Sequence, residues 1–217
     1  MFVEKYKPKT INEVIGNKVA ISKLVEFAKA YKNGILQRPL LIYGPNGVGK
    51  TCSVEALANT FDFDLIELNA SDYRDSERLK KRIETAMTTM NLFGKITLSL
   101  FDEIDELSEK FDSGAEKVII SIIQKAKQPV IFIADDFWNR KITFIRNYVE
   151  KVEFKKPYDN EIKSLLLNIL RNEGKFISED IINAIIKRSN GDVRGAINDL
   201  EIVMDQEPDM LDSIISK

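Results

Sequence analysis

Apolar positions along the chain follow two kinds of spacing. Short, almost continuous apolar runs are typical of strands buried on both faces of a parallel sheet, and apolar residues three and four positions apart are typical of amphipathic helices. Five runs of the first kind are expected to form strands, at residues 40–43, 64–69, 96–102, 130–134 and 149–154. Helical stretches are expected around residues 21–28, 79–90 and 115–126. This alternation predicts an α/β fold with a parallel five-stranded sheet.

The pattern changes after Pro157, where three helical stretches follow one another without an intervening strand. The first is expected to stop at Gly174 and the second to start at Ser178, because glycine often ends a helix and serine often caps one. We therefore expect two domains, an α/β domain over residues 1–156 and a small helical domain over residues 157–217.

The clearest chemical motif directly follows the first expected strand. It is the run Gly44-Pro45-Asn46-Gly47-Val48-Gly49-Lys50-Thr51. This run matches the phosphate-binding pattern G-x-x-x-x-G-K-[ST] at every required position, in which the lysine reaches the outer phosphates and the hydroxyl binds Mg²⁺. The segment after Thr51 has helical spacing, so its N-terminal dipole would face the same anion. The motif predicts a site for ATP and Mg²⁺ rather than a merely glycine-rich turn.

Two carboxylates, Asp102 and Glu103, end the third expected strand. In open α/β sheets ligands bind at the carboxyl ends of the strands, so this pair is expected beside the phosphate loop. Asp102 is then placed to hold Mg²⁺ through water or the Thr51 hydroxyl, and Glu103 to orient and deprotonate an attacking water. An Asp-Glu pair can also simply begin a loop, but its place after an apolar strand favours hydrolysis of ATP.

Composition narrows the possible chemistry. The 217 residues are 44% hydrophobic and 30% charged, as in a globular protein with a sizeable core. No apolar stretch approaches the roughly 20 residues of a membrane span, and the charged N-terminus lacks the apolar region of a signal peptide. We therefore expect a cytoplasmic protein with no membrane partner. One cysteine and no histidine exclude an internal disulfide, a Cys/His zinc site and a histidine-dependent nucleophile, so a general base must be a carboxylate.

Several further segments resemble motifs of the replication factor C clamp loaders, which are AAA+ ATPases. The resemblance rests on Glu4-Lys5-Tyr6-Lys7-Pro8-Lys9-Thr10, Glu67-Leu68-Asn69-Ala70-Ser71-Asp72 and Gly191-Asp192-Val193-Arg194-Gly195-Ala196-Ile197-Asn198-Asp199-Leu200. Two more, Asn91-Leu92-Phe93-Gly94 and Ala134-Asp135-Asp136, are most similar to the archaeal large subunit. By itself the segment 67–72 indicates only a turn that caps the following helix.

The resemblance implies a function and additional site residues. Tyr6, Val14 and Ile15 would cover the adenine, and Arg194 would reach the γ-phosphate from a helical lid. The implied function is ATP-driven opening of a sliding clamp and its loading on primer-template DNA, together with replication factor C small subunits. The alternatives are a subunit that binds ATP structurally with weak or no hydrolysis, or another AAA+ ATPase of DNA replication or repair.

The chain departs from the family pattern at two places. The sensor-1 position, usually asparagine, is Asp135, where a carboxylate near the γ-phosphate and Glu103 is electrostatically unfavourable. The small subunits carry a Ser-Arg-Cys segment where this chain reads Arg146-Asn147-Tyr148-Val149. The resemblance therefore implies that catalysis needs an arginine from a neighbouring subunit. It also implies a C-terminal collar domain, which is not found before Lys217, so we expect a fragment or a separately encoded collar.

A basic stripe at helical spacing is a candidate DNA contact. It consists of Arg74, Arg78, Lys81 and Arg82. Such a stripe can follow phosphates. A solvated helix face is the equally weighted alternative, because acidic residues are interleaved with these charges and the net charge of −2 gives no global sign of nucleic-acid binding.

Overall fold

The structure, a computed structural model, describes residues 1–68, 95–106 and 113–205. Five parallel strands form one sheet in the order β2-β3-β4-β1-β5. The strands are β1 (Leu40–Tyr43), β2 (Asp64–Leu68), β3 (Thr97–Phe101), β4 (Val130–Ala134) and β5 (Glu150–Glu153). Each lies within one residue of its expected ends, so the predicted α/β fold with a parallel five-stranded sheet is confirmed.

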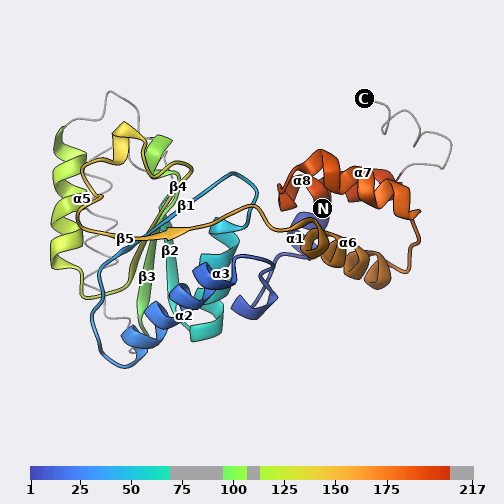
Figure 1. Ribbon diagram of the computed structural model, residues 1–217. Helices are drawn as coiled ribbons and strands as arrows, with labels where there is room; N and C mark the ends of the chain where they lie inside the picture. Colours follow the sequence, from blue (N-terminus) through green and yellow to red (C-terminus); the bar gives the residue numbers. More distant parts are fainter. Residues whose placement is uncertain (69–94, 107–112, 206–217) are drawn as a thin grey trace.

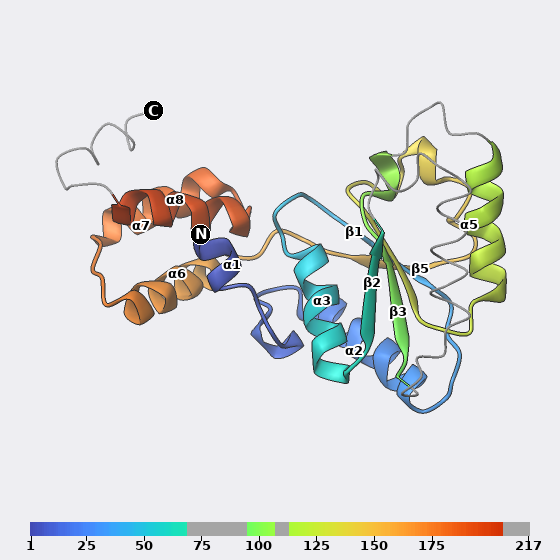
Figure 2. The same ribbon diagram turned by 180° about the vertical axis from the view of Figure 1, so that it is seen from behind.

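Helices cover both faces of the sheet (Figures 1 and 2). One face carries α2 (Lys18–Lys32) and α3 (Lys50–Phe61), and the other carries α5 (Ser113–Lys125). The described part also contains the short 3₁₀ turns η1 (Ile11–Glu13), η3 (Ile104–Glu106) and η4 (Arg140–Ile142). None of the helices in the described ranges is long and apolar enough to cross a membrane.

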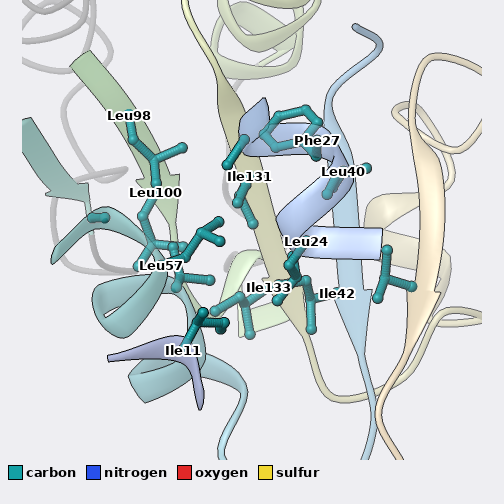
Figure 3. Close-up of a cluster of buried hydrophobic side chains, with 14 of the residues drawn as sticks. Ile11, Leu24, Phe27, Leu40, Ile42, Leu57, Leu98, Leu100, Ile131 and Ile133 are labelled. Carbon is teal, nitrogen blue, oxygen red and sulfur yellow. The ribbon is translucent and has the colours of Figure 1, made fainter. Parts of the chain in front are cut away.

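The central strands are buried on both faces, which explains their nearly continuous apolar sequence. Along β1, Leu40 and Ile42 belong to the cluster under α2 and α3, whereas Leu41 belongs to the cluster under α5. The first cluster is shown in Figure 3 and includes Leu24, Leu57, Leu98, Leu100, Ile131 and Ile133. The two clusters fix the sheet between its helices, so the loops at the carboxyl ends of the strands project from a rigid base.

The C-terminal part of the described chain is helical, as the sequence predicts. It contains α6 (Asp159–Glu173), α7 (Glu179–Ser189) and α8 (Val193–Asp205). These helices enclose a separate apolar cluster that includes Leu166, Ile169, Ile182 and Leu200. We call these three helices the helical region.

The N-terminus packs on the helical region rather than on the sheet (Figure 1). The short helix α1 (Phe2–Lys5) contacts α8, and Phe2, Val3, Tyr6 and Ile15 are partly buried against the helical cluster. The backbone N–H of Phe2 also donates to a Glu201 carboxylate oxygen at 2.9 Å. The first residues therefore connect the helical region to the α/β core.

Candidate functional site

A cavity of about 730 Å³ lies at the carboxyl ends of the strands, with α8 and the N-terminal segment on its other side. The predicted site residues that line it are Tyr6, Val14, Ile15, Asn46, Gly47, Val48, Gly49, Lys50, Thr51, Asp102, Glu103, Asp135 and Arg194. Gly44 and Pro45 do not line the cavity, but their carbonyl oxygens accept hydrogen bonds from Lys50. The fold thus brings the predicted residues together, while their individual roles stay predictions.

The phosphate loop connects β1 to α3 through left-handed backbone that only glycine adopts without strain. Gly44 has φ 151° and Gly47 has φ 73°. A Cβ at Gly44 would lie 2.0 Å from the Phe154 carbonyl oxygen, so the loop needs the missing side chain for close packing as well as for its turn. Because α3 begins at Lys50, its N-terminal amides face the cavity, where they favour an anion.

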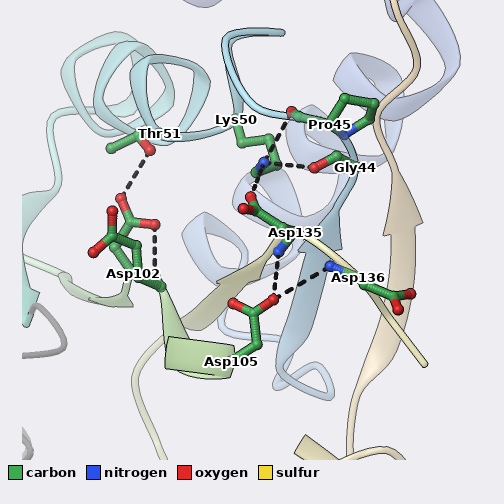
Figure 4. A network of polar contacts seen from close by, with 9 residues as sticks. Gly44, Pro45, Lys50, Thr51, Asp102, Asp105, Asp135 and Asp136 are labelled. Carbon is green, nitrogen blue, oxygen red and sulfur yellow. Dashed lines mark hydrogen bonds and ion pairs between the residues drawn. The ribbon is translucent and has the colours of Figure 1, made fainter. Parts of the chain in front are cut away.

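The Lys50 ammonium already has three acceptors within the protein (Figure 4). Its Nζ lies 2.6 Å from the Gly44 carbonyl oxygen, 3.0 Å from that of Pro45 and 2.8 Å from Oδ1 of Asp135. The Lys50 side chain is 7% exposed and that of Asp135 is 48% exposed. The carboxylate that the sequence analysis regards as electrostatically unfavourable is therefore paired with the lysine of the phosphate loop.

Thr51 and Asp102 form the expected pair beside this lysine. The Thr51 hydroxyl donates to Oδ2 of Asp102 at 2.8 Å, and Oδ1 of Asp102 accepts from the backbone N–H of Glu103 at 2.9 Å. A hydroxyl and a carboxylate oxygen at this spacing fit Mg²⁺, which takes few protein ligands when nucleotide phosphates and water complete its shell. Thr51 and Asp102 are therefore the residues that would hold Mg²⁺.

Glu103 follows β3 in a strained conformation. Its φ of 53° lies in the left-handed region, which non-glycine residues rarely adopt. Such strain persists only where the surroundings impose it, and it is often found at functional sites. Partial burial raises the pKa of the Glu103 carboxyl, and the carboxylates of Glu106, Asp102 and Asp135 raise it further. The side chain thus faces the cavity as a carboxylate with increased basicity.

Asp105 supports the site in a way that the sequence analysis missed. It lies in η3 and is 8% exposed, and its Oδ2 accepts from the backbone N–H of Asp135 at 2.9 Å and of Asp136 at 3.3 Å (Figure 4). Its signal in the sequence is an acidic residue shortly after Asp102-Glu103. Asp105 therefore fixes the backbone that carries Asp135.

The N-terminus of α8 is docked directly on the phosphate loop. The backbone N–H groups of Val193 and Arg194 lie 3.0 and 3.4 Å from the Gly47 carbonyl oxygen, to which they donate. Asp192 caps the helix, because its Oδ1 accepts from the backbone N–H of Gly195 at 2.9 Å. A Cβ at Gly47 would lie 1.7 Å from that same Oδ1. This contact places the exposed Arg194 side chain at the wall of the cavity.

The N-terminal segment contacts both sides of the cavity. The Tyr6 hydroxyl donates to the Glu173 carboxylate in α6, which also accepts from Lys5 Nζ at 2.5 Å. On the other side, Lys7 Nζ lies 2.5 Å from a carboxylate oxygen of Glu55 in α3. Partial burial and the Glu173 carboxylate raise the pKa of Tyr6 to about 12, so its hydroxyl stays a donor.

Arg146 lies outside the cavity lining and has other contacts. Its Nη2 donates to the Asn139 carbonyl oxygen at 2.6 Å, and its guanidinium lies 5.5 Å from the ring centres of Phe137 and Trp138. Arg146 thus lies against backbone and aromatic side chains rather than at the cavity. The predicted DNA contacts at 74, 78, 81 and 82, and the motif residues 69–72, lie outside the described residues.

Comparison with known proteins identifies the family. Residues 40–154, which contain the sheet, the phosphate loop and Asp102-Glu103, match the ATPase family associated with various cellular activities (AAA). The chain belongs to this family. Solved structures agree on the fold: the Thermotoga maritima RuvB Holliday junction branch migration motor superposes with a TM-score of 0.72 at 20% identity, covering 96% of this chain and 67% of that one.

Curated relatives confirm the resemblance found in the sequence. The chain is 38% identical over 94% of its length to the replication factor C large subunit of Methanococcus vannielii, and 39% identical over 92% to that of Thermofilum pendens. It spans 41% and 49% of these two relatives, respectively. The AAA chain therefore corresponds to less than half of each large subunit.

Proposed function

We propose that this chain is the ATP-binding part of a replication factor C large subunit and that its ATP cycle helps to open a sliding clamp and load it on primer-template DNA. The observation that carries the proposal is the cavity at which the phosphate loop, Asp102-Glu103 and Arg194 meet. The similarity to large subunits along more than nine tenths of the chain supports the choice of clamp loading among AAA functions.

The residues of the core would bind and cleave the nucleotide. The phosphate loop and the α3 N-terminus would hold the phosphates, with Lys50 moving from its present partners to the outer phosphate oxygens. Mg²⁺ held by Thr51 and Asp102 would neutralise charge that develops between the β- and γ-phosphates. Glu103 would accept the proton of the attacking water, a role that its raised pKa supports.

The helical region would sense whether the γ-phosphate is present. Arg194 projects from a helix whose N-terminus is bound to Gly47, so a phosphate held by the loop and by Arg194 would bias the orientation of the helical region. Such a change of orientation is a physical means of transmitting hydrolysis to subunits, clamp and DNA. The last catalytic charge would come from an arginine of a neighbouring subunit, as the resemblance to the clamp loaders implies.

A second candidate is a subunit that binds ATP but hydrolyses it poorly. The contact between Asp135 and Lys50 favours this candidate, because the Asp135 carboxylate binds the lysine ammonium that the outer phosphates need. Both candidates predict nucleotide binding, and they differ in turnover.

Turnover in the assembled complex tests the proposal. We expect this chain, combined with replication factor C small subunits that supply the arginine, to hydrolyse ATP slowly, and we expect clamp plus primed DNA to stimulate this turnover. The small subunits carrying an inactivating change in their own phosphate-loop lysine are the matched control, because they restrict hydrolysis to this chain. No stimulation would contradict the clamp-loader function, and no turnover at all would favour the second candidate.

A further inference from the structure

The Lys50 ammonium is bound by acceptors of the protein itself. An ammonium has three N–H donors, and Nζ has three acceptors, namely two backbone carbonyls and Oδ1 of Asp135. Only the third acceptor carries a full negative charge. A phosphate that binds Lys50 must therefore displace one of these partners, and the charged one is held most strongly.

The backbone of Asp135 is fixed at this position. It follows directly after β4, whose five residues are buried, and its backbone N–H donates to the buried Asp105 carboxylate at 2.9 Å. Its own side chain is half exposed and lines the cavity. The pairing thus results from two fixed elements, the loop that carries Lys50 and the strand end that carries Asp135 (Figure 4).

Among the described residues that line the cavity, negative side chains outnumber positive ones. Its lining includes the carboxylates Glu4, Glu13, Glu67, Asp102, Glu103 and Asp135, and the cations Lys7, Lys50 and Arg194. Lys7 is paired with Glu55 at 2.5 Å. Neutralisation of the phosphates' negative charge would consequently depend on Lys50, Arg194 and Mg²⁺. Asp135 competes with the phosphates for Lys50.

We propose that Asp135 determines the nucleotide preference of this site, acting as an internal counter-ion that occupies Lys50 and disfavours the γ-phosphate. This inference rests on the proposed nucleotide-binding function. A triphosphate places one more charged phosphate near the Asp135 carboxylate than a diphosphate does. Asp135 therefore lowers affinity for ATP more than affinity for ADP. The site would then retain ADP more readily than one with a neutral side chain at this position.

The test compares Asp135→Asn with the wild-type chain, using Kd values for the slowly hydrolysed analogue ATPγS and for ADP, both with Mg²⁺. We expect the variant to bind ATPγS about tenfold more tightly and ADP no more than about threefold more tightly, the scale of removing one like charge at a binding site. The difference should shrink as salt increases, because screening weakens interactions between partly exposed charges.

Asp136→Asn is the matched control. This neighbour has the same charge and also follows β4, but its Oδ1 accepts from the backbone N–H of Trp138 at 2.8 Å and points away from Lys50 (Figure 4). We expect it to leave both Kd values unchanged. Asp135→Ala, which keeps no polar group at the position, should also favour ATPγS relative to ADP.

Each outcome bears on the inference. If the wild-type chain binds neither nucleotide, the proposed function fails and this inference fails with it. If the wild-type chain binds both and Asp135→Asn leaves the ratio of the two Kd values unchanged, or weakens ATPγS more than ADP, the proposed function stands and the counter-ion role is wrong. A parallel gain with Asp136→Asn would show only a general charge effect and would also overturn it.

Discussion

The two sides of the nucleotide cavity are constructed differently. On the core side, charged side chains at strand ends contact one another, as Lys50 does with Asp135 and Thr51 with Asp102. On the helical side, the main contact joins backbone to backbone, from the α8 N-terminus to the Gly47 carbonyl oxygen. Charge at the core can therefore be altered without moving the fold, whereas the helical contact depends on close approach.

The two sides of the cavity also differ in what they contribute: the core side holds the candidate catalytic groups, and the helical side holds the contacts between the two regions. The core rests on a sheet buried between two apolar clusters, which can hold a strained residue such as Glu103 in place. The helical region has its own smaller cluster and reaches the core through Gly47, through the N-terminal segment and through the chain after β5. A change on the core side should alter the reaction, and a change on the helical side should alter how the regions are coupled.

Glu103→Gln is expected to produce the largest effect. If the core side performs the chemistry, loss of this carboxylate should lower ATP turnover on the order of a hundredfold or more, the usual contribution of a general base. The amide keeps the size of the side chain and removes a negative charge from the cavity, so ATPγS should bind at least as tightly as to the wild type, with a gain of no more than about tenfold (1.4 kcal/mol). Turnover and Kd measured on the same preparation check both statements. A large loss of affinity would mean that the variant changes the site rather than the reaction.

Gly47→Ala should weaken the contact between the phosphate loop and the N-terminus of α8, and should thereby lower both stability and nucleotide affinity. The new Cβ would collide with Asp192, and overpacking of this kind typically costs about 1–3 kcal/mol. Gly34→Ala is the matched control, because Gly34 has the same φ of 73° but nothing within 4 Å of its Cβ position. The control should show only the backbone cost of about 1–2 kcal/mol in the free energy of unfolding, with unchanged nucleotide affinity.

A double variant separates the effect of the collision with Asp192 from a general effect of the Gly47→Ala change on the loop. Adding Asp192→Ala to Gly47→Ala removes the carboxylate that the Cβ meets and should restore part of the lost nucleotide affinity. Denaturant unfolding and ATPγS titration on the four proteins of this cycle measure the coupling. Equal losses for Gly47→Ala and Gly34→Ala, or no recovery in the double variant, would mean that the contact between loop and helix is unimportant.

The two sides also differ in how well sequence predicts them. The strands and the Gly44–Thr51 loop could be predicted because their signals are local, in runs of apolar residues and in a fixed spacing. Contacts between distant segments left no such signal, and these include Gly47 with Asp192 and Phe2 with the helical cluster. Asp105 was missed because a buried acceptor of two backbone N–H groups has the same sequence signature as a solvated loop carboxylate.

Tyr6→Phe should produce the smallest effect, because it removes one hydrogen bond between the N-terminal segment and α6. ATPγS affinity should fall about two- to threefold, the size of a weak net hydrogen bond. The loss should shrink when Glu173→Gln is already present, since the amide oxygen can still accept from Tyr6 but without the negative charge that strengthens the bond. Equal losses in both backgrounds would instead assign the effect to the aromatic ring and its place beside the nucleotide.

The pH dependence of this contact provides an independent check on the Tyr6–Glu173 link. Hydrogen bonds from Lys5 and Tyr6 lower the pKa of Glu173 below its ordinary value of 4.5. A carboxyl with a lowered pKa in the folded state contributes stability that is present above the ordinary value and is lost as pH falls through the lowered one. The stability difference between wild type and Glu173→Gln should therefore be constant near neutral pH and shrink only below about pH 4.5. Thermal unfolding at a series of pH values measures it, and a difference that shrinks near pH 7 would contradict the assignment of the contact to this carboxylate.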